Sequence, residues 1–504
     1  MSEPLPGMPP APPSPRPRDA AAVVMVRPAG DSVEAYWVRR ERHLSFAANF
    51  FAFPGGRLDA SDAQVQVADA FGDESALRVA AARELFEETG VLIAQGAERV
   101  DPAALAEARR ALLEHQASFA ELLARHSLTL RACDFLEAGR WVTPDFMPIR
   151  FNARFYLVDA PAGARPEVWR GELAEGAWTT PAAALSRWKA GSVLLHPPAL
   201  FAMQTLAEFT SSADAAARMS MPPYSPNATA SRIEFQEGIR VFPLLAPTLP
   251  PATHTNALVL GNGELLVVDP GSPEVRQYAR LLALLAGYKA EGKRVKAVVV
   301  THHHQDHLGG AKAVKDRLGV PLWCHARTAE RLAFSPERLL EDGERLTLAG
   351  DPVMNFKVLH TPGHAPGHLC LVDEASKAAI VGDMVSGLGT VVIDPADGDM
   401  AEYLKQLARL KAWPVGTIYP AHGPLIPDGQ AKLTEYLAHR AAREQLVLAA
   451  VTAAGATLGE VVAAAYTDTP TFMHPIAERS AEATLIKLER EKKVARRDGR
   501  YFPA

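Results

Sequence analysis

The chain has 504 residues, more than one hydrophobic core usually supports, so roughly two to four domains are expected. Its 48% hydrophobic and 22% charged residues exclude a disordered or fibrous protein, and its net charge of -5 excludes a global attraction to nucleic acid or membrane. Three scattered cysteines exclude a disulfide framework and indicate a reducing compartment. Because no apolar run reaches membrane-spanning length, we expect a cytoplasmic protein without membrane contact.

Pro-rich and Ser-rich segments divide the chain. Residues 1–19 lack the apolar core of a secretory signal and are interpreted as a disordered leader. The segment Met219–Thr229 holds three prolines and no helical or strand period, which indicates a linker over 216–231. Long helical patterns replace short β-rich runs after Gly429. The expected domains are 20–215, 232–429 and 430–504.

The first of these domains carries an acidic helix. Residues 49–92 begin with NFFAFPGGRL and end with AARELFEETGVL. On a helix, Glu84, Glu87 and Glu88 lie at i, i+3 and i+4, so their carboxylates share one face and can hold magnesium or manganese. Gly90 ends this helix. A solvated acidic face would explain the charges but not the paired glycines, so we prefer the metal site.

The run RELFEETGV resembles the core of the Nudix box, the signature of a family that hydrolyses diphosphate linkages in nucleoside diphosphate derivatives. The resemblance covers residues 20–215 and implies an α/β/α sandwich. The implied catalytic residues are Glu84, Glu87 and Glu88, of which the last two hold the metal. The assigned substrate-binding residues are Gly55, Gly56 and Arg83. The family's glutamate before the arginine is replaced by Ser75, and a long insertion follows FPGG, as in the coenzyme A diphosphatases.

The middle region contains short β-rich runs that each end in a polar turn with glycine: LLVVDPG, KAVVVTHHH, KVLHTPGH, AIVGD and TIYPAHG. Side chains at the ends of successive buried strands meet at one rim of a sheet, the usual place of an active site in α/β architecture. The densest cluster, THHHQDHLGG, combines imidazole and carboxylate ligands that zinc prefers. One short loop cannot wrap all of them around one ion, so two adjacent ions and further ligands from His364, Asp383 and His422 are expected.

The HxHxDH motif and the later TPGH, VGD and PAHG runs resemble the metallo-β-lactamase superfamily, which implies an αββα sandwich. The resemblance implies a first metal held by His302, His304 and His364, a second held by Asp306, His307 and His422, and Asp383 as the bridge. Two zinc ions lower the pKa of water, so the expected nucleophile is a metal-bound hydroxide. Asp306 is a candidate catalytic residue, although either it or the metals could manage the leaving-group proton. Asp269 resembles the family's structural aspartate.

Other histidines of this region are not expected to bind metal. His303 lies between the ligands in an extended segment, where its side chain points away from theirs, so we interpret it as a packing or supporting residue. The histidines interpreted as satisfied polar or core residues are His254, His325, His360 and His368. His360 is the nearest rival to His364.

The tail after residue 429 predicts a small winged helix. An amphipathic helix from Tyr436, a short helix at GATLGEVVAAAY, a helix over Glu478–Glu491 and a basic, strand-like end follow in order. The tail resembles that of β-lactamase-like endoribonucleases, which cleave single-stranded RNA. The basic residues that could contact phosphates are Lys487, Arg490, Lys492, Lys493, Arg496, Arg497 and Arg500. A solvated charged face explains them equally well, because no aromatic platform lies among them.

Together these patterns predict an α/β multi-domain hydrolase with two activities on small molecules that contain a diphosphate or a (thio)ester linkage. For the middle domain, cleavage of single-stranded RNA competes with thioester or ester hydrolysis of the glyoxalase II kind, and the tail slightly favours RNA. The alternative from another class is a Nudix-like domain that only senses a nucleotide or acyl-coenzyme A. Oligomer formation is left open.

Overall fold

The computed structural model describes residues 15–42, 44, 47–70, 72–144, 146–147, 149–221 and 233–504. They form two compact units, one ending at Glu237 and the other beginning at Gly238. The expected leader and linker lie largely outside the described residues. Where they are described, strand β1 already begins at Arg18 and helix α6 extends to Met219.

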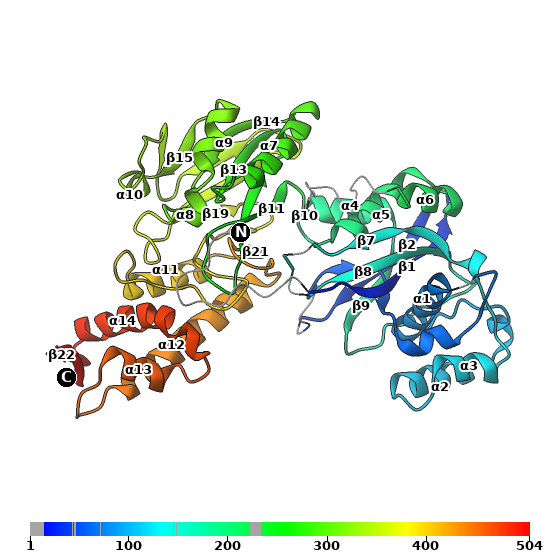
Figure 1. Ribbon diagram of the computed structural model, residues 1–504. Coiled ribbons are helices and arrows are strands. Elements are labelled where there is room, and N and C mark those ends of the chain that lie inside the picture. Colours follow the sequence, from blue (N-terminus) through cyan, green and yellow to red (C-terminus); the bar gives the residue numbers. More distant parts are fainter. Residues whose placement is uncertain are drawn as a thin grey trace. The chain divides into compact units, whose positions relative to one another are not determined.

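The first unit is a sheet between two helical layers (Figure 1). Its strands are β1 (Arg18–Ala29), β2 (Ser32–Arg40), β3 (Phe51–Ala52), β4 (Gly55–Arg57), β5 (Val67–Ala68), β6 (Leu130–Arg131), β7 (Leu136–Val142), β8 (Phe151–Asp159), β9 (Leu173–Thr179) and β10 (Ile233–Gln236). Its helices are η1 (Ala60–Gln64), α1 (Asp73–Thr89), η2 (Ala97–Arg99), α2 (Pro102–Leu113), α3 (Phe119–Arg125), η3 (Ala132–Asp134), α4 (Pro181–Lys189), α5 (Pro197–Glu208) and α6 (Ser212–Met219).

Strand β1 lies at the centre of this sheet, whose order is β3-β2-β1-β8-β7, with β4 paired to β1 and β9 paired to β2. Because successive side chains of a strand point to opposite faces, β1 supplies two separate cores. Val23 and Met25 pack into the cluster that contains helix α1, whereas Val24 and Val26 pack into the cluster that contains helix α5. The arrangement confirms the predicted α/β/α sandwich.

Helix α1 forms over a run of strong helix formers that includes three consecutive alanines. It ends at Gly90, whose φ of 74° lies in the left-handed region and whose N–H donates to the carbonyl of Phe86. Leu85 and Phe86 are fully buried against the sheet. Burial of this face fixes the rotation of the helix and thereby the direction of its glutamates.

A partly buried histidine is expected to make the first unit sensitive to acid. His196 stacks on Phe50 with ring centroids 4.1 Å apart, and burial, with a smaller contribution from Arg40, lowers its pKa to about 4. Relative to the unfolded value of 6.5, the folded state prefers the neutral ring. The stability that this preference contributes is present above pH 6.5 and is lost as pH falls toward 4.

Between about pH 7 and 5, the unfolding free energy of the wild type should therefore fall by about 2 kcal/mol more than that of a His196→Phe variant. Urea titrations of the full chain, followed for the transition of the first unit, measure the difference. His126→Phe is the matched control because His126 is partly exposed. Parallel pH profiles for wild type and His196→Phe would contradict the expectation.

The second unit contains two sheets that lie face to face. Within this unit, the strands of the first sheet follow the order β11-β12-β13-β14-β15-β16 and those of the second the order β17-β18-β19-β20-β21. The first sheet comprises β11 (Ile239–Leu245), β12 (His254–Leu260), β13 (Glu264–Val268), β14 (Arg294–Val299), β15 (Leu322–His325) and β16 (Arg338–Leu340). The second comprises β17 (Arg345–Leu348), β18 (Met354–His360), β19 (Leu369–Asp373), β20 (Ala379–Ile380) and β21 (Ile418–Tyr419).

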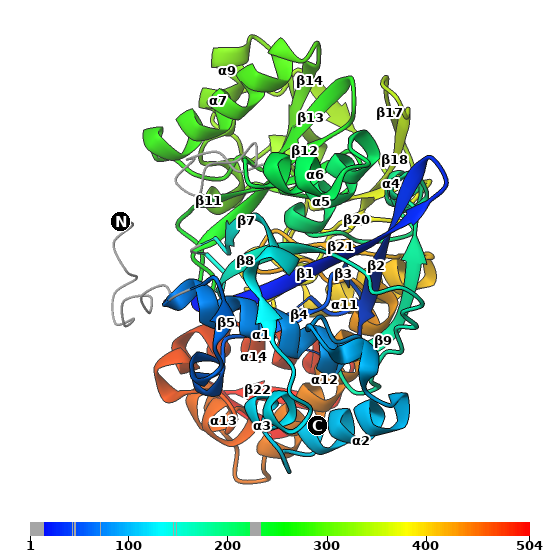
Figure 2. The same cartoon turned by 90° about the vertical axis from the view of Figure 1, so that its right-hand side faces the viewer.

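Helices cover the outer faces of both sheets, which confirms the predicted αββα sandwich. Figure 2 shows α7 (Val275–Ala290) and α9 (Ala311–Leu318) beside β13 and β14. The second sheet packs on α11 (Met400–Ala412) and on the start of α12 (Gly429–Ala450) through a shared apolar cluster. Two short helices, α8 (Gln305–Leu308) and α10 (Ala326–Ala329), lie in loops.

The tail is a winged helix that shares a unit with the sandwich. It contains α12, α13 (Leu458–Ala465), η4 (Thr471–Met473), α14 (His474–Arg490), β22 (Val494–Arg497) and β23 (Arg500–Pro503). The order agrees with the prediction, but α14 begins at His474 and not at Glu478. Pro475 accounts for the difference, because proline is favoured in the first turn of a helix, where its missing N–H is not needed.

The described cysteines are all unpaired. Cys133 is exposed, whereas Cys324 and Cys370 are buried. Burial raises the pKa of each buried thiol to about 12, so both stay protonated at neutral pH.

No helix among the described residues has both the length and the hydropathy needed to cross a bilayer.

Candidate metal centres

The predicted ligands of the second unit follow the ends of four strands. The loop with His302, His304, Asp306 and His307 begins where β14 ends at Val299 and passes into α8. His364 follows β18, Asp383 follows β20 and His422 follows β21. Since β14 belongs to one sheet and the other strands to the second sheet, the site lies where the two sheets meet at one end. The structure brings these side chains together at one rim, as the sequence predicted.

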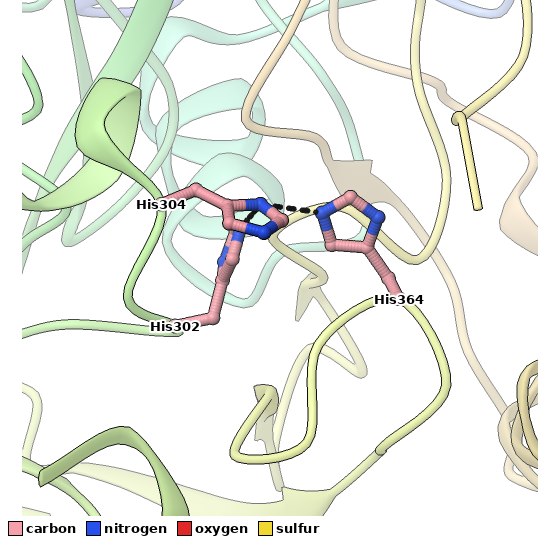
Figure 3. A group of neighbouring side chains, drawn as sticks. All are labelled: His302, His304 and His364. Carbon is pink, nitrogen blue, oxygen red and sulfur yellow. Dashed lines mark hydrogen bonds between the residues drawn. The ribbon is translucent and has the colours of Figure 1, made fainter. Parts of the chain in front are cut away.

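Three imidazoles form the first group (Figure 3). Nε2 of His302 and Nε2 of His364 each lie 3.0 Å from Nδ1 of His304. The outer nitrogen of His364, Nδ1, donates to the carbonyl of Val392 at 3.0 Å. A carbonyl can only accept, so this nitrogen carries the proton and the inner Nε2 of the neutral ring presents a lone pair. Burial lowers the pKa of His302 well below its usual value and that of His364 to about 4, which favours the neutral, metal-binding form.

The second group contains one carboxylate and two imidazoles, Asp306, His307 and His422. Nε2 of His422 lies 3.4 Å from Oδ2 of Asp306. The outer nitrogen of His422 donates to the carbonyl of His254 at 3.0 Å, which again directs a lone pair of the neutral ring inward.

Asp383 faces both groups, with a different oxygen toward each. Oδ2 lies 3.4 Å from Nε2 of His364, whereas Oδ1 lies 3.4 Å from Nε2 of His422 and 3.5 Å from Nε2 of His307. This is the geometry expected of a carboxylate shared between two ions.

The inner nitrogen of His307, Nε2, indicates whether the second group could hold a cation. Nδ1 of this ring bonds to Oδ2 of Asp269 at 2.8 Å, while the fully buried Nε2 has no hydrogen-bond partner among the described residues. A buried polar atom without a partner is costly unless it binds something else. Although burial lowers them, the charges of Asp383 and its neighbours raise the pKa of His307 well above its usual value and that of His422 to about 10. The cluster therefore attracts positive charge, which divalent cations would supply.

Supporting contacts hold the ligands in place, and one of the residues that make them had no signal in the sequence. His304 Nε2 and His303 Nε2 lie 3.1 and 3.0 Å from Oδ2 of Asp397, so His303 has the expected supporting contact. The prediction that its side chain points away from the ligands was wrong, because its ring lies beside that of His304 with centroids 4.9 Å apart. His368 Nε2 accepts from the backbone N–H of Asp383 at 3.0 Å. Such contacts orient metal ligands and fix their protonation. Asp397 lies in a loop without a recognisable ligand motif, so no sequence signal indicated it.

The remaining predicted residues keep roles outside the metal groups. Asp269 accepts from the N–H and hydroxyl of Thr301 at 2.7 and 2.6 Å and from His307, as the resemblance implied. His360 bonds to the carbonyl of Pro366 and stacks on His325 with centroids 3.8 Å apart.

In the first unit, the three glutamates of α1 lie beside the glycines of β4. The backbone N–H of Gly55 donates to Oε2 of Glu88 at 2.9 Å. A Cβ on Gly56 would lie 2.4 Å from the carboxylate of Glu84, so only glycine leaves room for it. Burial, despite the opposing charge of Arg83, raises the pKa of Glu84 to about 7, and burial with the charge of Glu84 raises that of Glu88 to about 8.

Burial is the largest cause of these raised pKa values, and a bound magnesium or manganese ion would offset it by supplying positive charge. Among the described residues, close groups of three ligand atoms occur only in the second unit. Oxygen-ligated magnesium usually keeps several waters and needs few protein ligands, so the looser arrangement of the glutamates is compatible with such a site.

Arg83 is buried and engages acidic side chains. Its guanidinium contacts Glu84 at 2.9 Å and Glu87 at 3.3 Å, and it binds both carboxylate oxygens of Asp62 at 2.8 and 2.9 Å. Its assignment to substrate binding stays a prediction, but these contacts favour an orienting role. Asp62 lies in η1, within the segment between the FPGG run and α1. The sequence showed only that Ser75 replaces the family's glutamate, and not that Asp62 pairs with the arginine.

We expect Asp62→Ala to destabilise the first unit by about 3 to 5 kcal/mol, because it leaves the guanidinium of Arg83 buried without its bidentate partner. Thermal melting of the full chain measures the effect. Asp59→Asn is the matched control, since Asp59 is exposed and asparagine can replace it as the N-cap of η1. Equal losses in the two variants would contradict the orienting role.

The sandwich and the two ligand groups that meet at its end define a metal-dependent hydrolase. Residues 250–422 match the model of the Metallo-beta-lactamase superfamily, residues 63–206 that of the NUDT19 Nudix domain and residues 457–500 that of the Beta-lactamase associated winged helix domain. The Beta-lactamase-like protein 2 homolog of Drosophila melanogaster is 31% identical over 259 residues, 48% of this chain and 84% of its own length. The chain belongs to the metallo-β-lactamase superfamily, and it joins that fold to a Nudix domain.

Two further proteins match parts of the chain. The Atrochrysone carboxyl ACP thioesterase of Aspergillus fumigatus is 30% identical over 203 residues, which are 39% of this chain and 59% of that protein. The crystal structure of a NUDIX hydrolase from Alicyclobacillus acidocaldarius has 29% sequence identity and a TM-score of 0.36, and the match covers 41% of this chain and 99% of that one.

Proposed function

We propose that the chain is a bifunctional hydrolase whose second unit binds two zinc ions and cleaves thioesters, and whose first unit cleaves diphosphates. The two ligand groups bridged by Asp383 carry the proposal for the second unit. Imidazole and carboxylate ligands at this spacing favour zinc. The three unpaired cysteines support a reducing compartment such as the cytoplasm.

Two bound dications would supply a water of low pKa and would polarise the thioester carbonyl. In the reaction, the oxygen of water bonds to the acyl carbon, the carbon–sulfur bond breaks, and the sulfur leaves as a thiol. Asp306 accepts the proton from water and returns it to the sulfur in this scheme. Although burial raises it, the charges of His307 and His422 lower the pKa of its carboxyl to about 2, so the side chain is ionised before it reacts.

The tail supports a thioester over single-stranded RNA. Five of the seven basic residues named above form ion pairs with acidic neighbours: Lys487 with Glu444, Arg490 with Asp399, Lys493 with Glu491, Arg496 with Glu482 and Arg500 with Glu460. Paired charges attract phosphates weakly, because each contact to RNA has to replace an existing ion pair. The thirty per cent identity to a thioesterase supports the same choice.

For the first unit, the helix that carries Glu84, Glu87 and Glu88 supports hydrolysis of nucleoside diphosphate or coenzyme A-type diphosphates with magnesium or manganese. Water bonds to one phosphorus, the bridging phosphorus–oxygen bond breaks, and two phosphate monoesters result. An acyl-coenzyme A contains both the thioester and the diphosphate, so one class of molecule would serve both units.

The deciding experiment compares an acyl-coenzyme A, S-lactoylglutathione, a lactone and single-stranded RNA as substrates of the full chain. Release of free thiol, detected by chromatography, is expected from the thioesters at rates well above those of RNA cleavage. Metal analysis of the same preparation should find two zinc ions per chain. Cleavage of RNA in preference to every thioester would reject the thioester assignment, and a chain that binds no metal would reject the hydrolytic site altogether.

A further inference from the structure

The segment from Met384 to Asp399, here called the ligand loop, connects the bridging Asp383 to helix α11. It carries two of the supporting groups of the first metal group. The carbonyl of Val392 accepts from Nδ1 of His364 at 3.0 Å, and Oδ2 of Asp397 lies 3.1 Å from Nε2 of His304. The loop contains no regular secondary structure, so its backbone needs partners from elsewhere in the fold.

The winged-helix tail supplies those partners from buried side chains. The hydroxyl of Tyr436 accepts from the N–H of Ser386 at 3.0 Å and donates to the carbonyl of Gly389 at 3.2 Å. One turn along α12, the guanidinium of Arg440 donates to the carbonyl of Val391. From α14, the hydroxyl of Ser480 accepts from the N–H of Ile393 at 3.1 Å. At the surface, Arg479 and Arg490 pair with Asp394 and Asp399.

These bonds flank the residue that orients His364. Val391 is held by Arg440 and Ile393 by Ser480, so both neighbours of Val392 are tied to the tail. Arg440 and Ser480 are 6% and 7% exposed, so neither bond competes with bulk water. A shift of the Val392 carbonyl would rotate the imidazole of His364 and move its inner nitrogen away from His304 and Asp383.

We propose that Arg440 and Ser480 are positioning residues of the first metal group, and that the winged-helix tail acts as a support of the metal centre. The inference rests on the proposed metal site but not on its substrate. Loss of either contact should loosen His364 and weaken binding of the metal at that group, whereas the second group, whose ligands do not contact Val392, should keep its ion.

The test measures metal affinity in Ser480→Ala and Arg440→Met by competition with a chromophoric chelator in the full chain. We expect one of the two ions to bind about 10-fold more weakly in each variant, in line with the effect of supporting groups around other metal sites. The visible absorption of the cobalt-substituted protein, which reports ligand geometry, should change for one of the two ions. Both readouts are independent of turnover.

Matched controls separate positioning from general loss of stability. Arg443→Met removes a buried arginine one turn further along α12, whose bonds go to Ala465 and Asp468 inside the tail. Thr484→Val removes a hydroxyl of α14 that donates to the carbonyl of Ser480 within the same helix. These variants should melt at lower temperature but keep the wild-type affinity and cobalt spectrum.

The outcomes are distinguishable. Wild-type affinity in both Ser480→Ala and Arg440→Met, or equal weakening in the controls, would overturn the inference while leaving the metal site intact. A wild type that binds no metal would instead reject the proposed function. Should Arg440→Met fail to fold, Ser480→Ala decides alone, because it removes one hydroxyl and no buried charge.

Discussion

Replacing Asp306 by asparagine is expected to lower kcat for thioester hydrolysis on the order of 10³-fold, within the range that positioned acids and bases contribute. The carboxylate lies beside Nε2 of His422, at 3.4 Å, and asparagine can neither hold a negative charge there nor accept a proton from water. Steady-state kinetics with an acyl-coenzyme A, together with metal analysis of the same sample, measures the effect. KM should change far less than kcat, because the lost group acts in the chemical step.

The control is Asp316→Asn, the same change on the exposed side of helix α9, where the carboxylate pairs with Lys312 at 2.6 Å. Its kcat should equal that of the wild type. If Asp306→Asn retains more than about a tenth of the wild-type kcat with both ions bound, Asp306 does not handle the proton, since the loss would lie below the range for acid–base groups.

Changing both Glu87 and Glu88 to glutamine is expected to lower diphosphate hydrolysis by at least about 10³-fold, because the metal's charge stabilisation contributes several kcal/mol. Thioester hydrolysis in the second unit should be unaffected. In metal-free protein the first unit should melt at the same or a higher temperature at pH 8. Burial and the charge of Glu84 raise the pKa of Glu88 to about 8, so the folded state favours the protonated form and loses stability as pH rises through that value. Glutamine cannot ionise and avoids this loss.

Glu74→Gln, on the exposed first turn of the same helix, is the matched control and should keep full diphosphatase activity. The experiment also addresses the alternative of a nucleotide or acyl-coenzyme A sensor. A wild type that binds such a ligand in the presence of magnesium but never hydrolyses it would favour the sensor. Activity that survives the double change would show that these glutamates do not hold the metal.

The fold and the principal ligands could be predicted because their signals are local. Strand runs that end in TPGH or VGD place their polar side chains at the rim of a sheet, whatever the details of packing. The spacing of Glu84, Glu87 and Glu88 alone places their side chains on one face of a helix. The α/β/α and αββα layers follow from the same periodicities. Helix α14 begins at His474, before the predicted start at Glu478, because its first turn accommodates Pro475.

The supporting contacts could not be predicted, because they depend on which distant backbone group reaches a side chain. Val392 acts through its carbonyl, which has the same chemistry in every residue. Arg440 and Ser480 look like ordinary helix residues until the tail is folded against the ligand loop. Asp62 lies in a segment of irregular spacing, where one carboxylate among several cannot be singled out without coordinates.

The unequal exposure of the three thiols should allow selective labelling of the chain. Cys324 and Cys370 are buried with raised pKa values, whereas Cys133 is exposed on the first unit. A maleimide dye should therefore attach at one position in the native chain, with no engineered cysteine. A fluorophore at Cys133 would report events in the Nudix unit, while the unit with the metallo-β-lactamase fold stays unmodified.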